Sequence, residues 1–201
     1  MHDSIPRWGD RRRTTVGLLG GSFNPAHQGH LHVAQVARKR LRLDQVWLLV
    51  SPGNPLKPTA GMASPEARLA SARAIADGRR IVATAIEGHL HTRYTVDTLR
   101  RLRIRFPHVH FVWLMGADNL VQLPAWNGWL EIARHTPFAV LPRPTYNHRA
   151  LAGQAAQRLR PARHLERQAP ALQRFAAPAW VFLPASENSE SATAIRARNH
   201  V

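Results

Sequence analysis

Short apolar runs alternate with longer segments whose apolar residues recur at helical spacing. An uninterrupted apolar run of four to six residues is typical of a strand that is buried on both faces of a sheet. Six such runs predict strands at residues 16–19, 46–50, 81–85, 110–115, 137–141 and 180–183.

The segments between these runs carry helix signals. Apolar positions at residues 30–41 follow one helix face, and Ser64 followed by Pro65 is typical of a helix start. Thr95 can cap a helix that runs to Arg105, because Pro107 ends the pattern. Residues 191–198 predict a short closing helix, whereas residues 143–178 are rich in proline and arginine and predict only partial helix.

Strands that alternate with helices of this length favour an α/β fold, a Rossmann-like doubly wound parallel sheet with flanking helices. Ligands bind such sheets outside the C-terminal strand ends. We therefore expect the loops after Leu19, Val50 and Met115 to share one crevice. Residues 1–15 are polar and basic and predict an N-terminal tail, which leaves residues 16–201 as a single domain.

The amino-acid composition excludes several kinds of functional site. The chain has 28 Lys and Arg residues against 12 Asp and Glu, a formal net charge of +16, and no cysteine. Disulfides, thiol nucleophiles and cysteine-based zinc sites are thereby excluded. No apolar run approaches the ~20 residues of a membrane helix, so we expect no membrane partner and a soluble, cytoplasmic protein.

The positive charge is spread along the whole chain and accompanies no nucleic-acid-binding motif. Solvated arginines and a phosphate-rich small substrate explain it better than specific nucleic-acid binding. A basic nucleic-acid-binding module remains the alternative outside the enzymes.

The loop of residues 20–30 carries the strongest chemical signal. Glycines at a strand end let a phosphate approach the backbone, and the following helix start offers free N–H groups. His27 and His30 are three residues apart and can face the same ligand there. The alternatives are structural histidines or a metal pair, and a zinc site would recruit His32, His89 or His91 without a carboxylate at ligand spacing.

Five motifs in a fixed order resemble those of the HIGH-type nucleotidyltransferases, and within them of the bacterial nicotinate-nucleotide adenylyltransferase family. Residues 20–30 match the opening Gly-Gly-x-Phe-Asp/Asn-Pro-x-His-x-Gly-His in full. The others are Tyr94-Thr95, Gly116-Ala117-Asp118, Trp126, and Ser191-Ala192-Thr193-Ala194-Ile195-Arg196. Ala192 departs from the family's serine, and Leu56 stands where the family often has histidine.

The resemblance implies the HIGH-type nucleotidyltransferase fold and the transfer of AMP from ATP to nicotinate mononucleotide, which yields deamido-NAD and pyrophosphate. It implies Mg²⁺ that accompanies ATP and no dedicated protein metal site. It implies catalytic roles for His27, His30 and Arg196. Implied ATP-binding residues are Gly20, Gly21, Ser22, Phe23, His30, Gly116, Asp118, Ser191, Thr193 and Arg196, and implied substrate-binding residues are Lys57, Tyr94, Thr95, Trp126 and Asn127.

Plainer interpretations stay open for several of these residues. The closing Ser-x-Thr-x-x-Arg motif is also an ordinary helix cap, Lys57 can be a solvated lysine, and Asp118 can be a helix N-cap. Trp129 competes with Trp126 for the ring contact. Arg68 and Asp97 are expected on helix surfaces, and Phe23 and Trp113 in packing.

Other transferases of the same fold are the closest alternative enzymes, namely phosphopantetheine adenylyltransferase or a cytidylyltransferase. Those families usually open with Gly-Thr-Phe-Asp. Association as a homodimer is left open by the sequence.

Overall fold

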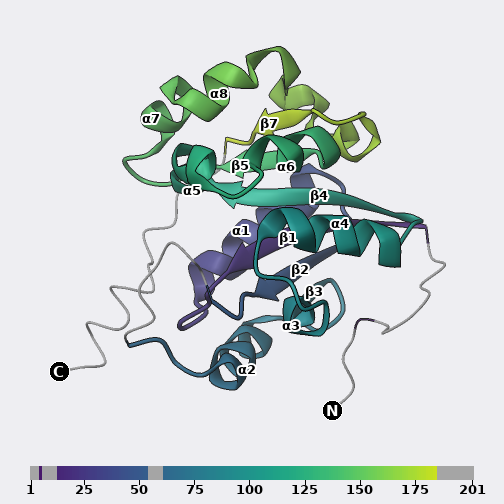
Figure 1. Cartoon of the computed structure of the whole chain (residues 1–201), viewed down its shortest axis with the longest axis vertical. Coiled ribbons are helices and arrows are strands. Elements are labelled where there is room, and N and C mark those ends of the chain that lie inside the picture. Colours follow the sequence, from purple (N-terminus) through teal and green to yellow (C-terminus); the bar gives the residue numbers. More distant parts are fainter. Residues whose placement is uncertain (1–4, 6–12, 54–60, 185–201) are drawn as a thin grey trace.

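The computed structural model describes residues 5, 13–53 and 61–184 of the chain. These residues form a seven-stranded sheet in the order β3-β2-β1-β4-β5-β7-β6, in which every pairing is parallel (Figure 1). The strands are β1 (Thr14–Gly21), β2 (Gln45–Val50), β3 (Ile81–Thr84), β4 (Val109–Gly116), β5 (Phe138–Leu141), β6 (Arg163–His164) and β7 (Trp180–Phe182).

Helices cover both faces of this sheet. They are α1 (Gln28–Arg40), α2 (Pro65–Ile75), α3 (Ile86–His89), α4 (Thr95–Arg105), α5 (Ala117–Gln122), α6 (Trp129–His135), α7 (Asn147–Ala152) and α8 (Gln154–Arg158), with 3₁₀ turns η1 (Leu123–Ala125), η2 (Arg160–Ala162) and η3 (Glu166–Arg174). Buried residues of α1, α2 and η3 share one core cluster. Those of α3 to α8 belong to the cluster on the opposite face.

The central strands are mostly apolar because both of their faces are covered. In β1, Val16 and Leu18 belong to one core cluster, while Leu19 belongs to the other. All three side chains are at most 7% exposed. This two-sided burial explains why the sequence shows continuous apolar runs rather than alternation.

The path of the chain divides between β1 and β4. From β1 it continues to β2 and β3 on one side, and from β4 it continues to β5, β6 and β7 on the other, where β7 lies between β5 and β6. The connections on the two sides therefore leave in opposite directions, and a crevice opens between them at the C-terminal strand ends. The loop after Gly21 and helix α5, which begins directly after Gly116, lie at these strand ends.

Most predicted elements are confirmed, with a few corrections at their ends. All six predicted strands are present. The structure adds β6, a two-residue strand within residues 143–178 that no apolar run predicts. Helix α4 spans the predicted residues, but its N-cap is Tyr94 and not Thr95. Ser64 caps α2 as predicted, and its hydroxyl accepts a hydrogen bond from the Ala67 N–H.

The described part of the predicted tail packs against the domain. Strand β1 begins at Thr14, two residues before the predicted start, because the Asp44 carboxylate accepts hydrogen bonds from the Thr15 N–H and from both threonine hydroxyls. Ile5 is 5% exposed and belongs to the core. The division between a tail at residues 1–15 and one domain at residues 16–201 stays a prediction.

Within the ranges that the structure describes, no helix has the length and apolar character needed to cross a bilayer. The predicted closing helix at residues 191–198 lies outside those ranges.

Candidate functional site

A cleft of about 460 Å³ opens at the C-terminal ends of the central strands. Most of its lining comes from the end of β1, the loop after β2, the start of α4 and the end of η1 with the residues after it, and α3, β4 and α5 contribute one residue each. Its lining includes Gly20, Gly21, Ser22, Ser51, Gly53, Glu87, Arg93, Tyr94, Thr95, Trp113, Asn119, Ala125, Trp126 and Asn127.

Close packing holds the aromatic wall of this cleft in place. A Cβ at Gly20 would lie 2.7 Å from Cη2 of Trp113, so only glycine lets the strand pass the indole. Trp113 in turn meets Trp126 edge to face, with ring centroids 6.5 Å apart. Trp113 is 3% exposed, which confirms its packing role, whereas Trp126 is only partly buried. Of these two rings, that of Trp126 is the more exposed, and both line the cleft.

Trp129, its competitor, packs against the core and is not part of the cleft lining. The three-residue spacing of the two tryptophans could not separate them. The left-handed Gly128 between them, with φ of 63°, is the N-cap of α6, so Trp129 is the first residue of that helix and Trp126 precedes it.

The two histidines of the first loop stand together at the start of α1. His27 is the N-cap residue, and its ring centroid lies 3.8 Å from that of His30. The backbone N–H of His27 donates to Nδ1 of His30 over 3.2 Å. Because Nδ1 accepts this bond, the proton of a neutral His30 ring lies on Nε2, which is left to donate.

His30 is neutral at physiological pH. Burial, together with the charges of His27 and Arg143, lowers the pKa of His30 to about 3. A neutral imidazole with its proton on Nε2 is a directed single donor, suited to a phosphate oxygen.

Asp118 is the second residue of α5 and not its N-cap, which is Gly116; the N-cap interpretation is wrong. Its Oδ1 atom is buried, lies 3.7 Å from Nε of Arg143, and accepts no hydrogen bond from the residues that the structure describes. A Cβ at Gly116 would lie 2.3 Å from this oxygen. Glycine at position 116 is therefore required for the carboxylate to stand where it does, as an acceptor at the end of β4.

Arg68 contradicts its predicted place on a helix surface, because its side chain is 1% exposed. Its guanidinium donates to four backbone carbonyls, those of Ser22, Ser51, Pro52 and Ala63. Helical spacing could show that position 68 lies on α2, but not that loop carbonyls from distant parts of the chain converge on it. Asp97 does lie at the surface as predicted, in an ion pair with Arg100.

Glu87 is a cleft residue that the sequence analysis missed. It lies on α3, is 8% exposed, and its Oε1 accepts a hydrogen bond from the Thr98 hydroxyl over 3.0 Å. Thr98 and Thr92 share a further hydrogen bond of 2.8 Å. Burial raises the pKa of the Glu87 carboxyl to about 7, and the bond from Thr98 only partly opposes this.

The structure gathers the predicted site residues into two adjoining groups. Gly20, Gly21, Ser22, Tyr94, Thr95, Trp126 and Asn127 line the cleft. His27 and His30 lie beside it, linked to Gly21 through the contact of the Phe23 ring with His30, and Gly116 and Asp118 lie at the end of β4. Phe23 is 1% exposed, so its side chain packs, and only its backbone can serve a ligand. Lys57, Ser191, Thr193 and Arg196 lie outside the described residues.

No group of three or more His, Asp or Glu side chains is placed to hold a metal ion among the residues that the structure describes. His32, His89 and His91 therefore form no such group with the loop histidines.

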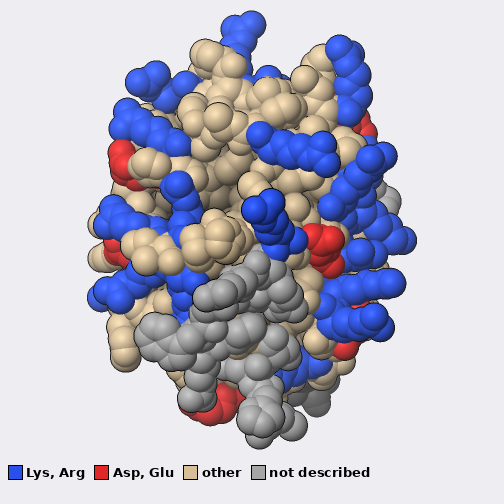
Figure 2. Space-filling model, turned by 90° about the vertical axis from the view of Figure 1, so that its right-hand side faces the viewer, with Lys and Arg blue, Asp and Glu red and all other residues tan. Residues whose placement is uncertain are grey.

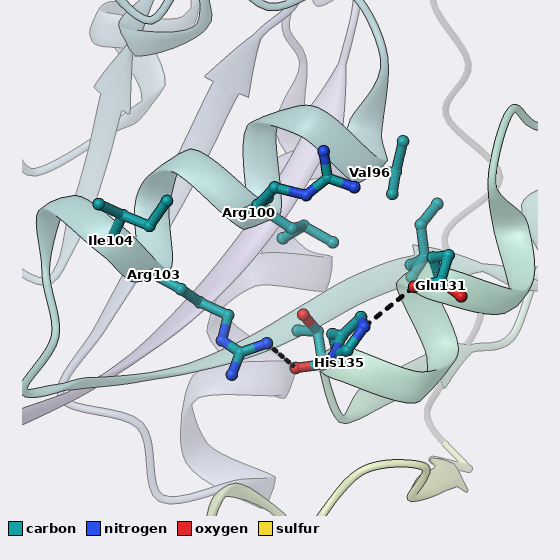
Figure 3. Close-up of a pocket in the computed structure, with 9 residues that line it drawn as sticks. Val96, Arg100, Arg103, Ile104, Glu131 and His135 are labelled. Atoms are coloured by element: carbon teal, nitrogen blue, oxygen red, sulfur yellow. Dashed lines mark hydrogen bonds and ion pairs between the residues drawn. The ribbon is translucent and has the colours of Figure 1, made fainter.

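A second hollow of about 220 Å³ lies between α4 and α6, away from the strand ends. In Figure 3, Arg103 donates to the carbonyl of His135, whose ring pairs with Glu131 over 3.0 Å. Its wall also includes Val96 and Ile104.

Basic side chains are scattered over the face of the molecule in Figure 2 rather than gathered in one tract.

Comparison with known proteins identifies similar sequences and folds. A family model described as cytidylyltransferase-like matches residues 18–198. A protein of Gluconacetobacter diazotrophicus named "Probable nicotinate-nucleotide adenylyltransferase" is 60% identical over 194 residues, which cover 96% of this chain and 90% of the relative. A protein of the same name from Gluconobacter oxydans is 59% identical, covering 90% of this chain and 93% of the relative.

The fold also matches a solved structure. Plasmodium falciparum nicotinic acid mononucleotide adenylyltransferase, complexed with NaAD, superimposes with a TM-score of 0.66 over 92% of this chain and 83% of that one. At 14% identity this likeness concerns the fold alone.

The raised pKa of Glu87 predicts a pH-dependent cost of folding. The folded-state pKa lies above the unfolded one, so stability falls as pH rises from about 4.5 to 7, and the full cost applies above pH 7. We expect Glu87→Gln, which can still accept from Thr98, to stabilise the protein at pH 8 by about 2 kcal/mol, or roughly 4–8 °C in Tm. The gain should vanish near pH 4.5.

Thermal unfolding at the two pH values measures this effect. Glu131→Gln is the matched control, since its ion pairs with Arg134 and His135 lower the pKa of that carboxyl and the change should give no gain at pH 8. An equal Tm shift for Glu87→Gln at both pH values would contradict the prediction.

Proposed function

The chain belongs to the nicotinate-nucleotide adenylyltransferase family, and on that premise we propose that it transfers the adenylyl group of ATP to nicotinate mononucleotide. One observation carries the proposal: a glycine-rich strand end, the start of α4 and an aromatic wall line the same cleft, and the start of α1 follows the same strand end. Phosphates suit the strand end and the start of α1, a carboxylate suits the start of α4, and a flat ring suits the aromatic wall.

The reaction needs no covalent intermediate with the protein. A phosphate oxygen of nicotinate mononucleotide forms a bond to the α-phosphorus of ATP, and the bond from that phosphorus to the bridging oxygen of the β-phosphate breaks. The electron pair leaves on pyrophosphate, and deamido-NAD is the other product. Catalysis then consists of placing the two phosphates in line and stabilising the charge that develops.

We assign the phosphates to the start of α1. The Nε2–H of neutral His30 donates to the α-phosphate, and His27 beside it binds the adjoining phosphate oxygens. The backbone of Gly20, Gly21, Ser22 and Phe23 follows the phosphate chain. Arg196, Ser191 and Thr193 are proposed to bind the ATP phosphates and Lys57 to neutralise substrate charge, on the strength of the sequence motifs alone.

The nucleoside of ATP is proposed to lie along the end of β4. The buried Oδ1 of Asp118 is an acceptor for a ribose hydroxyl, and Gly116 leaves room for it. Mg²⁺ is proposed to arrive bound to the ATP phosphates, because phosphate oxygens are its usual ligands in such reactions.

The pyridine ring is proposed to stack on Trp126. Its carboxylate would lie at the start of α4, where Tyr94 and Thr95 line the cleft and the first N–H groups of the helix point outward. Asn127, also in the lining, would add a polar contact. We further propose that the enzyme works in the cytoplasm and needs no specific nucleic acid. Light scattering distinguishes a monomer from a homodimer.

A pyrophosphate-release assay with ATP and nicotinate mononucleotide tests the proposed function. We expect turnover in the presence of Mg²⁺ and formation of deamido-NAD in equal amount. Tight, salt-sensitive binding of DNA or RNA without pyrophosphate release would contradict the proposal and favour the basic binding module.

We expect nicotinate mononucleotide to be preferred over nicotinamide mononucleotide. A carboxylate only accepts hydrogen bonds, so the N–H groups at the start of α4 satisfy it, whereas an amide turns its own NH₂ toward those donors. Each buried group left unpaired costs about 1–3 kcal/mol, a factor of roughly 5–150 in kcat/KM. Equal kcat/KM for the two mononucleotides would show that the helix start does not select the substrate.

His30→Ala should lower kcat by about 10²–10³, with a much smaller effect on ATP affinity, because its donor acts on charge that grows in the transition state. His108→Ala, at an exposed position outside the cleft, is the control and should leave kcat unchanged. Wild-type turnover by a folded His30→Ala protein would refute the assignment.

A further inference from the structure

The guanidinium of Arg68 joins three separate parts of the chain from behind the cleft. Its NH1 donates to the carbonyls of Ser22 over 2.9 Å and of Ser51 over 2.6 Å, and its NH2 donates to that of Pro52 over 3.3 Å. Its Nε donates to the carbonyl of Ala63 over 3.0 Å. Ser22 and Ser51 line the cleft, whereas Arg68 does not.

The hydrogen-bond acceptors that the structure gives Arg68 are four carbonyls, and the Glu66 carboxylate acts on its guanidinium only through its charge. Burial lowers the pKa of its guanidinium, which nevertheless stays protonated at any physiological pH. A buried positive charge is costly to hold, and replacing it with an apolar side chain would relieve that cost. Holding the charge against peptide oxygens is therefore an arrangement that calls for a reason beyond packing.

Peptide geometry supplies a reason for burying this charge. The bond between Ser22 and Phe23 and that between Pro52 and Gly53 are trans, so in each the N–H points opposite to the carbonyl. Because the carbonyls of Ser22 and Pro52 accept hydrogen bonds from Arg68, the N–H groups of Phe23 and Gly53 point away from Arg68. A carbonyl that accepts from a cation also polarises its peptide, which makes the N–H on the other side a stronger donor.

The conformation of Phe23 is a second sign that this loop is held in place. Phe23 has φ of 48°, in the left-handed region, where a residue other than glycine is strained by about 1–2 kcal/mol. Its ring is 1% exposed and packs against Gly21, where an added Cβ would lie 3.2 Å from the ring, and against His30 at 4.9 Å. Such strain persists only where neighbours fix the backbone, and Arg68 fixes it at Ser22.

We propose that Arg68 is a positioning residue for adenylyl transfer: it aims and polarises the N–H groups of Phe23 and Gly53 toward the phosphates of ATP without touching the substrate. The inference rests on the proposed function, since that function puts ATP phosphates in the cleft. It extends the anion site from the first loop to the loop after β2, where the sequence motifs point only to Lys57.

Arg68→Lys tests the proposal, because lysine keeps the charge but cannot reach four carbonyls in a planar fork. We expect the KM for ATP to rise tenfold or more and kcat to fall by about tenfold to a hundredfold, as for a displaced phosphate. The stabilisation of the folded protein by ATP in a thermal-unfolding assay should shrink in parallel. Arg101→Lys, at an exposed position of α4, is the control and should match the wild type.

A purely structural role for Arg68 predicts a different pattern. It would lower the amount of folded enzyme and hence the maximal rate, while the KM for ATP and the kcat per folded molecule stayed at wild-type values. That pattern, or full wild-type kinetics, would overturn the proposal.

A second pair of variants removes the N–H itself and leaves Arg68 in place. Within the described ranges, no atom lies within 4 Å of a Cβ built at Gly53, so a side chain there meets no clash with them. Gly53→Pro lacks the N–H and Gly53→Ala keeps it, and we expect the proline variant to have at least a fivefold higher KM for ATP than the alanine variant. Equal KM values would overturn the proposal even if Arg68→Lys fails to fold.

A failure of this proposal can be distinguished from a failure of the proposed function. If the wild type releases no pyrophosphate, the adenylyltransferase assignment fails. Loss of the ATP-induced Tm shift in Arg68→Lys would then still support a phosphate-positioning role, and an unchanged shift would overturn it.

Discussion

The divergence of the chain between β1 and β4 is the constraint on which the site depends. In an all-parallel sheet every strand delivers its loop to the same edge, and only where the connections part does that edge have space for a ligand. Here the parting strands are neighbours with Leu19 opposite Leu114, and both end in glycine, Gly21 and Gly116. The glycines allow Phe23 and Asp118 to stand close to the strand ends, so the same two positions that end the sheet also shape the site.

His30, Glu87 and Arg68 lie around this crevice, and burial is the main cause of the pKa shift of each. His30 is kept neutral by burial and by nearby positive charge, and burial raises the pKa of Glu87, which the hydrogen bond from the Thr98 hydroxyl only partly opposes. Arg68 stays charged and is satisfied by carbonyls. Buried polar groups of this kind weaken a fold unless they are fully paired, so their concentration at one edge marks that edge as selected for function rather than for stability.

The sequence predicted the sheet well because its strands are buried on both faces and therefore read as unbroken apolar runs. It missed β6, since Arg163 and His164 pair at the edge and carry no apolar pattern. The loop of residues 20–30 was recognised from residue types alone, because glycine, histidine and a helix start are local features. Arg68 and Glu87 were missed for the opposite reason. Their partners, Ser22, Ser51 and Thr98, lie 11 to 46 residues away, and no spacing within α2 or α3 records them.

The net charge of +16 is a poor guide to how this site would hold phosphate. Most arginines on the face seen in Figure 2 are at the surface, where salt screens their attraction within about 10 Å. The donors proposed for phosphate include, besides the side chains that the sequence motifs imply, peptide N–H groups at the cleft and the neutral imidazole of His30 beside it, which are fixed in direction by the strand end, the helix start and the carbonyls bound to Arg68. Fixed dipoles need no rearrangement as charge shifts from the attacking oxygen to the leaving pyrophosphate, whereas a mobile cation would bind ATP and pyrophosphate with similar strength. The scattered arginines can thus raise the local concentration of anionic substrates, while the chemistry depends on a small set of oriented groups at the β1–β4 edge.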